Sequence, residues 1–242
     1  GNREDEEKIT PRISRRGLLD GILIQSGQPD DKLIDHLTKS SVPSVIIGRP
    51  FETEGISYID VDNIAGAMKA TRHLLDLGYS RVATITGRRD STVTFDRLEG
   101  YKKALTQANR AIDESLIAEG DFSEVSGYNA MKMLLASKPD AVFTASDIMA
   151  AGAIRAVQEE DLKVPDDIAF VGYDDVPLGM LLKVPLTTMR QPFTKFGVKA
   201  VELLIDLIEK GTEPARHIIL DTELVIRESC GARKSGAAPG GE

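Results

Sequence analysis

Two clusters of polar residues, each at the end of a short apolar run, are the part of this sequence best suited to chemistry. One run ends at Ser146-Asp147 and the other at Tyr173-Asp174-Asp175. Ligands bind at the carboxyl ends of strands in parallel α/β sheets, so we expect both clusters to face one crevice. Carboxylates there can accept hydrogen bonds from the hydroxyl groups of a sugar. The pattern therefore predicts a small-molecule receptor.

Each of these residues also has a structural interpretation. Ser146 and Asp147 stand where a helix N-cap is expected, which explains one of them and leaves the other for a ligand. We expect Asp147 to be the structural member of that pair. One of Asp174 and Asp175 could instead cap the turn that follows them, and Asp174 is the better ligand candidate.

Arg97 and Phe122 extend the candidate site. Arg97 lies one turn into an expected helix, and its guanidinium offers a fork of donors that suits vicinal hydroxyls or a carboxylate. The alternative is an ion pair with Asp96 or Glu99 on an exposed helix face. Phe122 follows a weak strand and could stack on a sugar or purine ring, although core packing is the commoner role of phenylalanine.

Continuously apolar runs alternate with helical stretches, which predicts a parallel sheet covered by helices on both faces. Residues 186–191 look extended but too short to pair as a strand, so we interpret them as a connection between lobes. The tail from residue 230 is rich in small residues and is expected to be disordered. The expected strands are 21–25, 44–48, 58–61, 82–86, 116–119, 141–145, 168–172, 216–220 and 223–227, and the expected helices are 29–39, 62–77, 94–108, 124–136, 193–210 and the stretch after Ser146.

Composition excludes several classes of protein. The 242 residues carry a net charge of −8, so the chain lacks the positive field of a nucleic-acid-binding domain. No apolar run is long enough to span a bilayer, and the single cysteine, Cys230, fits a reducing compartment. The three histidines are far apart in sequence, and nucleotide-binding and hydrolase motifs are missing, so we expect no metal, no cofactor and no enzyme.

Ten motifs follow one another along the chain from about Gly21 to Ser229. They are DGILIQS, VPSVIIGRP, YIDVDNIAGAMKATRHLLDLGYSRVATITG, DRLEGYKKAL, EGDFSEVSGYNAM, AVFTASDIMAAGAIRAV, VPDDIAFVGYDDVP, LTTMRQP, GVKAVELL and TELVIRES. Each motif alone is weak, but their joint occurrence in this order is specific. The series resembles the effector-binding core of the lactose-repressor/galactose-repressor family of bacterial regulators.

The resemblance implies an α/β, two-lobed fold like that of periplasmic binding proteins, with three crossings between the lobes. The N-terminal lobe would comprise residues 1–61 and 191–220, and the C-terminal lobe residues 62–190 and 221–229, followed by a tail of residues 230–242. Family members begin with a helix-turn-helix headpiece and a hinge helix, followed by a strand, a helix and a second strand of the N-terminal lobe. The resemblance therefore implies that this sequence starts around the second helix of that lobe, without the headpiece and the first part of the lobe.

Family members contact their ligand from the positions of Arg97, Phe122 and Asp174, and one of Ser146 and Asp147 does so as well. The resemblance adds further ligand-binding candidates and a surface for a second copy. Several relatives have an acidic residue at the position of Gly48, and this chain lacks that carboxylate. Arg49 could contact the ligand there as a donor instead, which would suit a different or acidic ligand. The added ligand candidates are Ser91, Gln191, Phe193 and Arg49, and the dimer candidates are Ala151, Leu181 and Leu182, for which core packing is an equal alternative.

These features predict the ligand-sensing core of a cytoplasmic transcriptional regulator. The resemblance implies that a small effector, expected to be a sugar, binds between the lobes and controls operator DNA binding through the missing headpiece. A homodimer is expected, and no membrane partner. The alternative is a periplasmic sugar-binding protein of a transporter, and a small-molecule enzyme is a weaker third reading.

Overall fold

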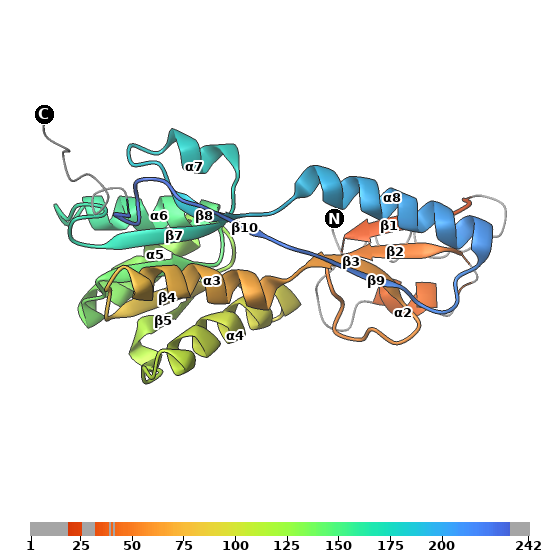
Figure 1. The fold of residues 1–242 in the computed structure, drawn as a ribbon, viewed down its shortest axis with the longest axis horizontal. Coiled ribbons are helices and arrows are strands. Elements are labelled where there is room, and N and C mark those ends of the chain that lie inside the picture. The colour runs from red at the N-terminus through yellow and green to blue at the C-terminus, as the bar shows by residue number, and fades with distance from the viewer. Residues whose placement is uncertain (1–18, 26–31, 39, 41, 233–242) are drawn as a thin grey trace, which may run out of the picture. The chain divides into compact units, whose positions relative to one another are not determined.

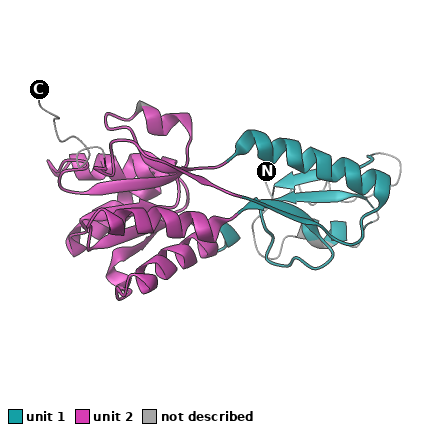
Figure 2. Cartoon of the chain, viewed as in Figure 1, with its two compact units in different colours: residues 1–61, 90–93, 192–220 teal, residues 62–89, 94–191, 221–242 magenta. Residues whose placement is uncertain are grey.

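The computed structural model describes residues 19–25, 32–38, 40 and 42–232, and these divide into two compact units. Unit 1 comprises residues 1–61, 90–93 and 192–220, of which 1–18, 26–31, 39 and 41 lie outside the described residues. Unit 2 comprises residues 62–89, 94–191 and 221–242, of which 233–242 lie outside them (Figure 2). The chain therefore passes between the units several times. The predicted lobes differ from the units in the placement of residues 90–93 and Gln191.

Unit 1 is built on a parallel sheet of four strands in the order β1-β2-β3-β9. Its long helix α8 (Phe193–Lys210) covers one face, and the short helix α2 (Lys32–Thr38) packs on the other (Figure 1). The alternation of side chains along a strand explains both layers, because Val45 packs with α8 whereas its neighbour Ile46 packs with Ile34 of α2. The strands are β1 (Ile22–Gln25), β2 (Ser44–Ile47), β3 (Ser57–Val61) and β9 (His217–Leu220).

Unit 2 has a six-stranded sheet in the order β10-β8-β7-β6-β4-β5. All neighbouring strands are parallel except β8 and β10. The carboxyl ends of β4 to β8 consequently lie along one edge of the sheet. The strands are β4 (Val82–Thr86), β5 (Ile117–Glu119), β6 (Ala141–Thr144), β7 (Ala169–Asp174), β8 (Thr187–Arg190) and β10 (Glu223–Val225).

Helices cover both faces of this sheet and bury two apolar clusters (Figure 1). Glycines allow α5 and α6 to approach closely, because a Cβ on Gly152 would lie 1.9 Å from the Glu124 carbonyl oxygen. The helices are α3 (Asn63–Asp76), α4 (Thr92–Gln107), α5 (Glu124–Leu134), α6 (Asp147–Gln158) and α7 (Pro177–Leu181), with short 3₁₀ turns at Glu114–Leu116 and Leu135–Ser137.

Most predicted elements are present with shifts of one or two residues at their ends. Helix α3 begins after Asp62, whose carboxylate accepts a hydrogen bond from the Ala65 backbone N–H at 2.8 Å, and Gly78 follows it in the left-handed region. Strand β4 and helix α8 have the predicted bounds. The first part of the predicted helix 29–39 lies outside the described residues.

The structure differs from the expected lack of strand pairing in residues 186–191 and from the expected start of the tail. Residues 186–191 were expected to be an unpaired connection, but Thr187–Arg190 forms strand β8 between β7 and β10. Pairing on both sides and full burial of Thr187 and Met189 stabilise this short strand. The chain is also packed beyond Ser229: Cys230 is fully buried in the core of unit 2, so a disordered tail does not begin there.

No helix in the described part of the chain is long and apolar enough to cross a membrane.

Candidate functional site

Arg97 is the centre of a polar cluster at the carboxyl edge of the unit 2 sheet. It lies in the second turn of α4 and is only 4% exposed. Its Nε donates to Asn63 Oδ1 at 2.9 Å, and its Nη1 donates to the Ala145 carbonyl oxygen, which follows β6. The Arg97 guanidinium also lies over the Tyr173 ring, with Cζ 3.6 Å from the ring centroid. Arg97 is therefore not part of an ion pair on an exposed helix face.

Asp174, the last residue of β7, is the acidic partner of Arg97. Its Oδ1 lies 3.4 Å from Arg97 Nη1 and accepts a hydrogen bond from Gln191 Nε2 at 2.6 Å. Burial raises the pKa of Asp174 above its ordinary value, although Arg97 and Gln191 oppose that shift. The structure thus joins residues that are far apart along the chain.

The Arg97–Asp174 pair leaves hydrogen-bonding atoms unused. Both interactions of Asp174 are made by Oδ1, so Oδ2 has no hydrogen-bond partner among the described residues. Arg97 bonds through Nε and Nη1, and its Nη2 has no partner in the same part of the chain. One donor group and one acceptor atom of this partly buried ion pair are therefore open to a ligand.

The backbone at the end of β7 is held in an uncommon conformation. Asp174 has φ of 112° and Asp175 has φ of 60°, values that side-chain-bearing residues rarely adopt. Asp175 is fixed by two arginines, accepting from Arg190 Nε at 2.7 Å and from Arg227 Nη2 at 2.5 Å. Burial would raise the pKa of Asp175, but these two arginines hold it below its ordinary value. Asp175 is thus a structural residue.

Asp147 has a role that the sequence indicated only in part. It is fully buried at the start of α6, where Oδ1 accepts from Thr188 Oγ1 at 2.6 Å and Oδ2 accepts from the Val176 N–H at 3.0 Å. It therefore caps the turn that either Asp174 or Asp175 was expected to cap. Burial raises the pKa of Asp147 to about 7; the hydrogen bond from Thr188 opposes the shift and the charge of Asp174 adds to it.

Ser146 is the N-cap of α6. Its hydroxyl oxygen accepts from the Met149 N–H at 3.2 Å, and the residue is 3% exposed. One of Ser146 and Asp147 was expected to cap the helix and the other to bind a ligand. In the structure both have structural roles, because Ser146 caps α6 and Asp147 holds the neighbouring turn. A contact between Ser146 and a ligand stays a prediction.

Phe122 lies at the same carboxyl edge, after β5. Its φ is 70°, and the side chain is half-buried against the backbone of Gly87, which follows β4. Asp121 holds this bend, since its Oδ1 accepts from the Ser123 N–H at 2.9 Å. The predicted loop position of Phe122 is confirmed, and its stacking on a ligand stays a prediction.

The remaining ligand candidates belong to unit 1, apart from Gln191, which contacts Asp174. Asp60, at the end of β3, accepts from the Arg49 backbone N–H at 2.8 Å, and Thr92 Oγ1 donates to the Arg49 carbonyl oxygen at 2.7 Å. Arg49 is thus tied to the segment that carries Ser91. Phe193 is the first residue of α8 and is 54% exposed.

Of the dimer candidates, Ala151 is buried on α6 and Leu182 is half-buried against the core cluster of unit 2. Leu181 is the last residue of α7. Core packing therefore explains the burial of Ala151 and the partial burial of Leu182. A dimer interface at these residues stays a prediction.

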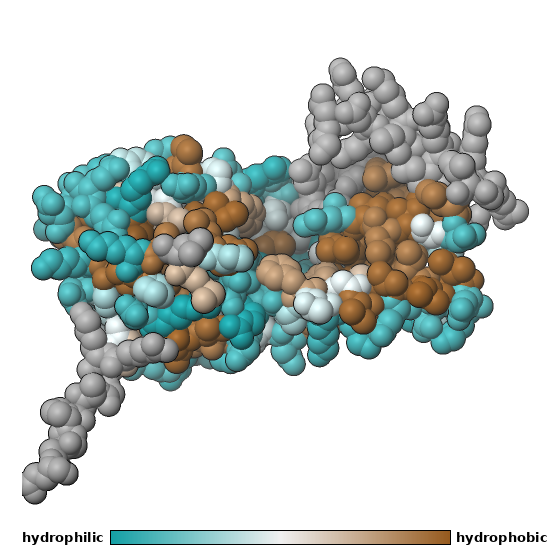
Figure 3. Space-filling model, turned by 90° about the horizontal axis from the view of Figure 1, so that it is seen from above, coloured by the Kyte–Doolittle hydropathy of each residue, from teal (hydrophilic) through white to brown (hydrophobic). Residues whose placement is uncertain are grey.

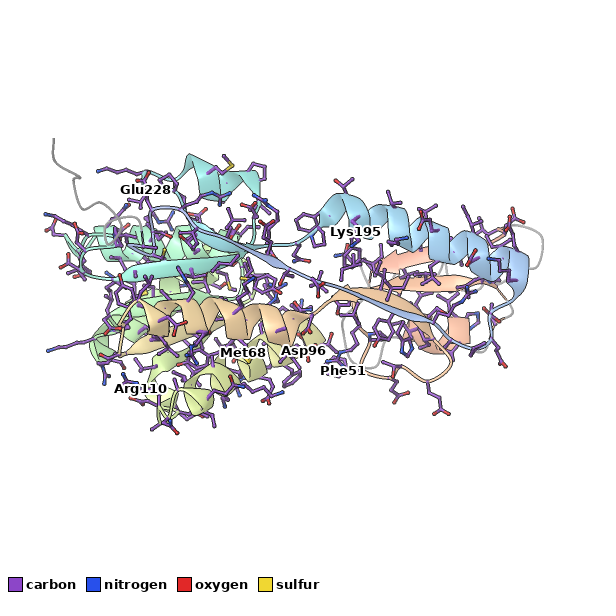
Figure 4. All side chains as sticks on the ribbon, viewed as in Figure 1. Phe51, Met68, Asp96, Arg110, Lys195 and Glu228 are labelled. Carbon is purple, nitrogen blue, oxygen red and sulfur yellow. The ribbon has the colours of Figure 1, made fainter. Side chains whose placement is uncertain are left out.

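Sequence reasoning missed Asn63 and Tyr173 as partners of Arg97. Asn63 is the first residue of α3, and Tyr173 immediately precedes Asp174 in β7. The only signal for either was proximity to a strand end, because both contacts join different elements of the fold. Figure 4 labels Asp96, the neighbour of Arg97 on α4. In the described ranges, no group of three or more His, Cys, Asp or Glu residues could hold a metal ion.

Comparisons with known proteins define the class of this fold. A model of the periplasmic binding protein-like domain matches residues 71–230. The solved structure of a CelR transcriptional regulator–cellobiose complex has a TM-score of 0.90 and 38% identity, covering 94% of this chain and 71% of that one. A LacI-family regulator from Enterococcus faecium with bound ribose has a TM-score of 0.83 and 26% identity, covering 93% and 83%.

Among curated proteins, CelR of Thermobifida fusca, an HTH-type transcriptional regulator, is 42% identical over 216 residues. The ribose operon repressor of Escherichia coli (strain K12) is 36% identical over 233 residues, a match that covers 93% of this chain and 70% of the repressor. The chain belongs to the LacI family of transcriptional regulators. The match to CelR covers 87% of this chain but 63% of the relative, so the chain spans less than two thirds of CelR.

Proposed function

We propose that this protein is the ligand-sensing part of a LacI-family transcriptional regulator and that unit 2 binds a sugar effector. The observation that carries the proposal is the buried Arg97–Asp174 pair, with Nη2 and Oδ2 left without partners among the described residues. Neither atom belongs to the buried polar atoms that lack a partner, so both can be reached from solvent by a ligand.

The chemistry of this pair suits adjacent hydroxyl groups. One hydroxyl of a sugar donates to Asp174 Oδ2, and its neighbour accepts from Arg97 Nη2. Gln191 and Asn63 hold the two side chains at 2.6 and 2.9 Å, so the ligand meets an already ordered arrangement. Phe122 supplies an aromatic face for the apolar side of a sugar ring.

The relatives support a sugar as the ligand class. One related structure holds cellobiose and another holds ribose, and a curated relative is a ribose operon repressor. We infer from them that this chain takes a mono- or disaccharide. The relatives reported above are regulators, which gives the transporter alternative no support and leaves no reason to assign a catalytic reaction.

In the whole regulator, the sugar would control operator DNA binding. Its effect is set by the difference in its affinity for the DNA-bound and DNA-free arrangements, since a ligand shifts an equilibrium only by that difference. We place such a regulator in the cytoplasm, as a homodimer with Ala151, Leu181 and Leu182 at the interface.

Calorimetric titration of the protein with cellobiose and with ribose tests the proposal. Replacing Asp174 with alanine removes the acceptor and leaves Arg97 buried without its counter-charge. We expect the affinity to fall by about 10- to 150-fold, the effect of losing a hydrogen bond to a charged group.

Glu99→Gln serves as the control, because Glu99 lies on the same helix as Arg97 and, among the residues that the structure describes, pairs only with Lys103 at the surface. Its affinity should equal that of the wild type. Binding of neither sugar by the wild type, or equal affinity in Asp174→Ala, contradicts the proposal.

A further inference from the structure

The hydroxyl group of Thr94 is buried without a hydrogen-bond partner among the described residues. Thr94 is 4% exposed and lies in the first turn of α4. An unsatisfied buried hydroxyl destabilises a fold, because the group has lost its water and gained nothing in exchange. A valine would have the same shape without this penalty, so the hydroxyl calls for an explanation.

Thr94 lies beside the cluster described above. It precedes Arg97 by three residues on α4, and residues at this spacing share one face of a helix. A Cβ built on Gly87 would lie 2.6 Å from Thr94 Oγ1 and 2.0 Å from Phe122 Cζ. The hydroxyl and the edge of the aromatic ring thus meet over Gly87, at the carboxyl edge of unit 2.

The position of the Phe122 ring depends on two local features. The absence of a side chain at Gly87 leaves the space that the ring occupies. The left-handed backbone of Phe122, with φ of 70°, directs the side chain there. Such backbone conformations store strain and recur at ligand-binding sites. The ring is only half-buried, so its exposed side is free to meet a ligand.

We propose that Thr94 is an additional effector-binding residue whose hydroxyl is covered by the Phe122 ring until the sugar displaces that ring from Gly87. The displaced ring stacks on the sugar, and the Thr94 hydroxyl hydrogen-bonds a sugar hydroxyl. Thr94 and Arg97 then contact the ligand from one helix face. This inference rests on the proposed function, since it assigns a further residue to the same site.

The test compares Thr94→Val with Thr94→Ser, titrating each variant with cellobiose and ribose by calorimetry. Valine removes the hydroxyl and keeps the shape, so the affinity should fall by about 3- to 10-fold. The melting temperature of the ligand-free protein should rise by about 2–4 °C, because the unsatisfied group is gone. Serine keeps the hydroxyl, and its affinity should stay within about twofold of the wild type.

Thr71 supplies a matched control. Its hydroxyl is also buried without a partner in the described part of the chain, but it lies on α3 among apolar core residues of unit 2. Thr71→Val should raise the melting temperature and leave the affinity unchanged. Unchanged affinity in Thr94→Val, a lower melting temperature in that variant, or an equal loss of affinity in Thr71→Val overturns the proposal.

A tryptophan in place of Phe122 reports the displacement directly, because the chain contains no other tryptophan. Saturating sugar should shift its emission, and an unchanged spectrum in a variant that still binds sugar overturns the displacement. If the wild type binds neither sugar, the proposed function itself fails. If the wild type binds but Thr94→Val binds equally well, only this inference fails.

Discussion

Units 1 and 2 share an α/β plan, with helices on both faces of the sheet, but differ in the size of the core that their described residues bury. Unit 2 has six strands and two large buried clusters, whereas unit 1 has four strands and two smaller ones. In unit 1 the helix α8 exposes Val198, Val201, Ile205 and Ile208, which are 42–52% accessible. Figure 3 shows a hydrophobic surface over this unit. The Arg97–Asp174 pair lies in the unit with the larger buried core.

The largest expected effect tests the core of unit 2. Phe170 lies at the centre of β7 and is fully buried, whereas Ile205 is 47% exposed on α8. Phe170→Ala should cost about 3–5 kcal/mol of unfolding free energy through the cavity that it leaves. Ile205→Ala should change the unfolding free energy by less than about 0.5 kcal/mol. Urea denaturation followed by circular dichroism measures both, and similar losses would remove the contrast between the units.

The second prediction concerns the pH dependence of stability in unit 2. The pKa of Asp147 rises from 3.8 to about 7 on folding, so the folded protein holds a proton that the unfolded chain releases. The stability from this group is present below about pH 4 and is lost as the pH rises towards 7, at up to about 1.4 kcal/mol per pH unit. Asp174, whose pKa is also raised, acts in the same direction. Asp147→Asn should flatten the profile between pH 4 and 7, and an unchanged slope would show that Asp147 is ionised throughout.

The third prediction concerns the two arginines that hold Asp175. Asp175→Asn weakens both hydrogen bonds and leaves Arg227, whose side chain is 13% exposed, without its counter-charge. The expected cost is about 1.5–3 kcal/mol in a denaturation experiment. The lowered pKa of Asp175 means that its contribution is present above pH 4 and is lost at lower pH, opposite to Asp147.

Arg190→Gln is the comparison for that variant, since the Arg190 side chain is 45% exposed. Its removal should cost less than about 1 kcal/mol. A larger loss in Arg190→Gln than in Asp175→Asn would reverse the assignment of the buried and exposed partners.

The smallest expected effect tests the exposed face of α8. Val201→Ser and Ile205→Ser should each change the unfolding free energy by about 0.5 kcal/mol or less, because these side chains already meet solvent. Leu203 is 5% exposed on the same helix, so Leu203→Ser should lower the unfolding free energy several times more. A large loss at Val201 would show that this face is covered in solution.

Local patterns sufficed to predict most elements of the fold. The cap at Asp62, the glycine after α3 and the continuous apolar run of β4 all act through neighbours in the chain. Strand β8 could not be found this way, because its stability comes from pairing with β7 and β10 and from burial of Thr187. The burial of Cys230 could not be predicted for the same reason, since its packing partners come from distant segments.

The sequence by itself determined the α/β class, the order of most elements, the placement of Phe122 and Asp174 at strand ends and the placement of Arg97 near the start of a helix. These properties follow from periodicity and from residue types acting over a few positions. Only the tertiary structure decided that Asp174 faces Arg97, that Asp175 faces two other arginines and that Asp147 holds the turn that follows them. Adjacent carboxylates look alike in a sequence, and only the strand pairing and the backbone torsions at the end of β7 give each one its own partner.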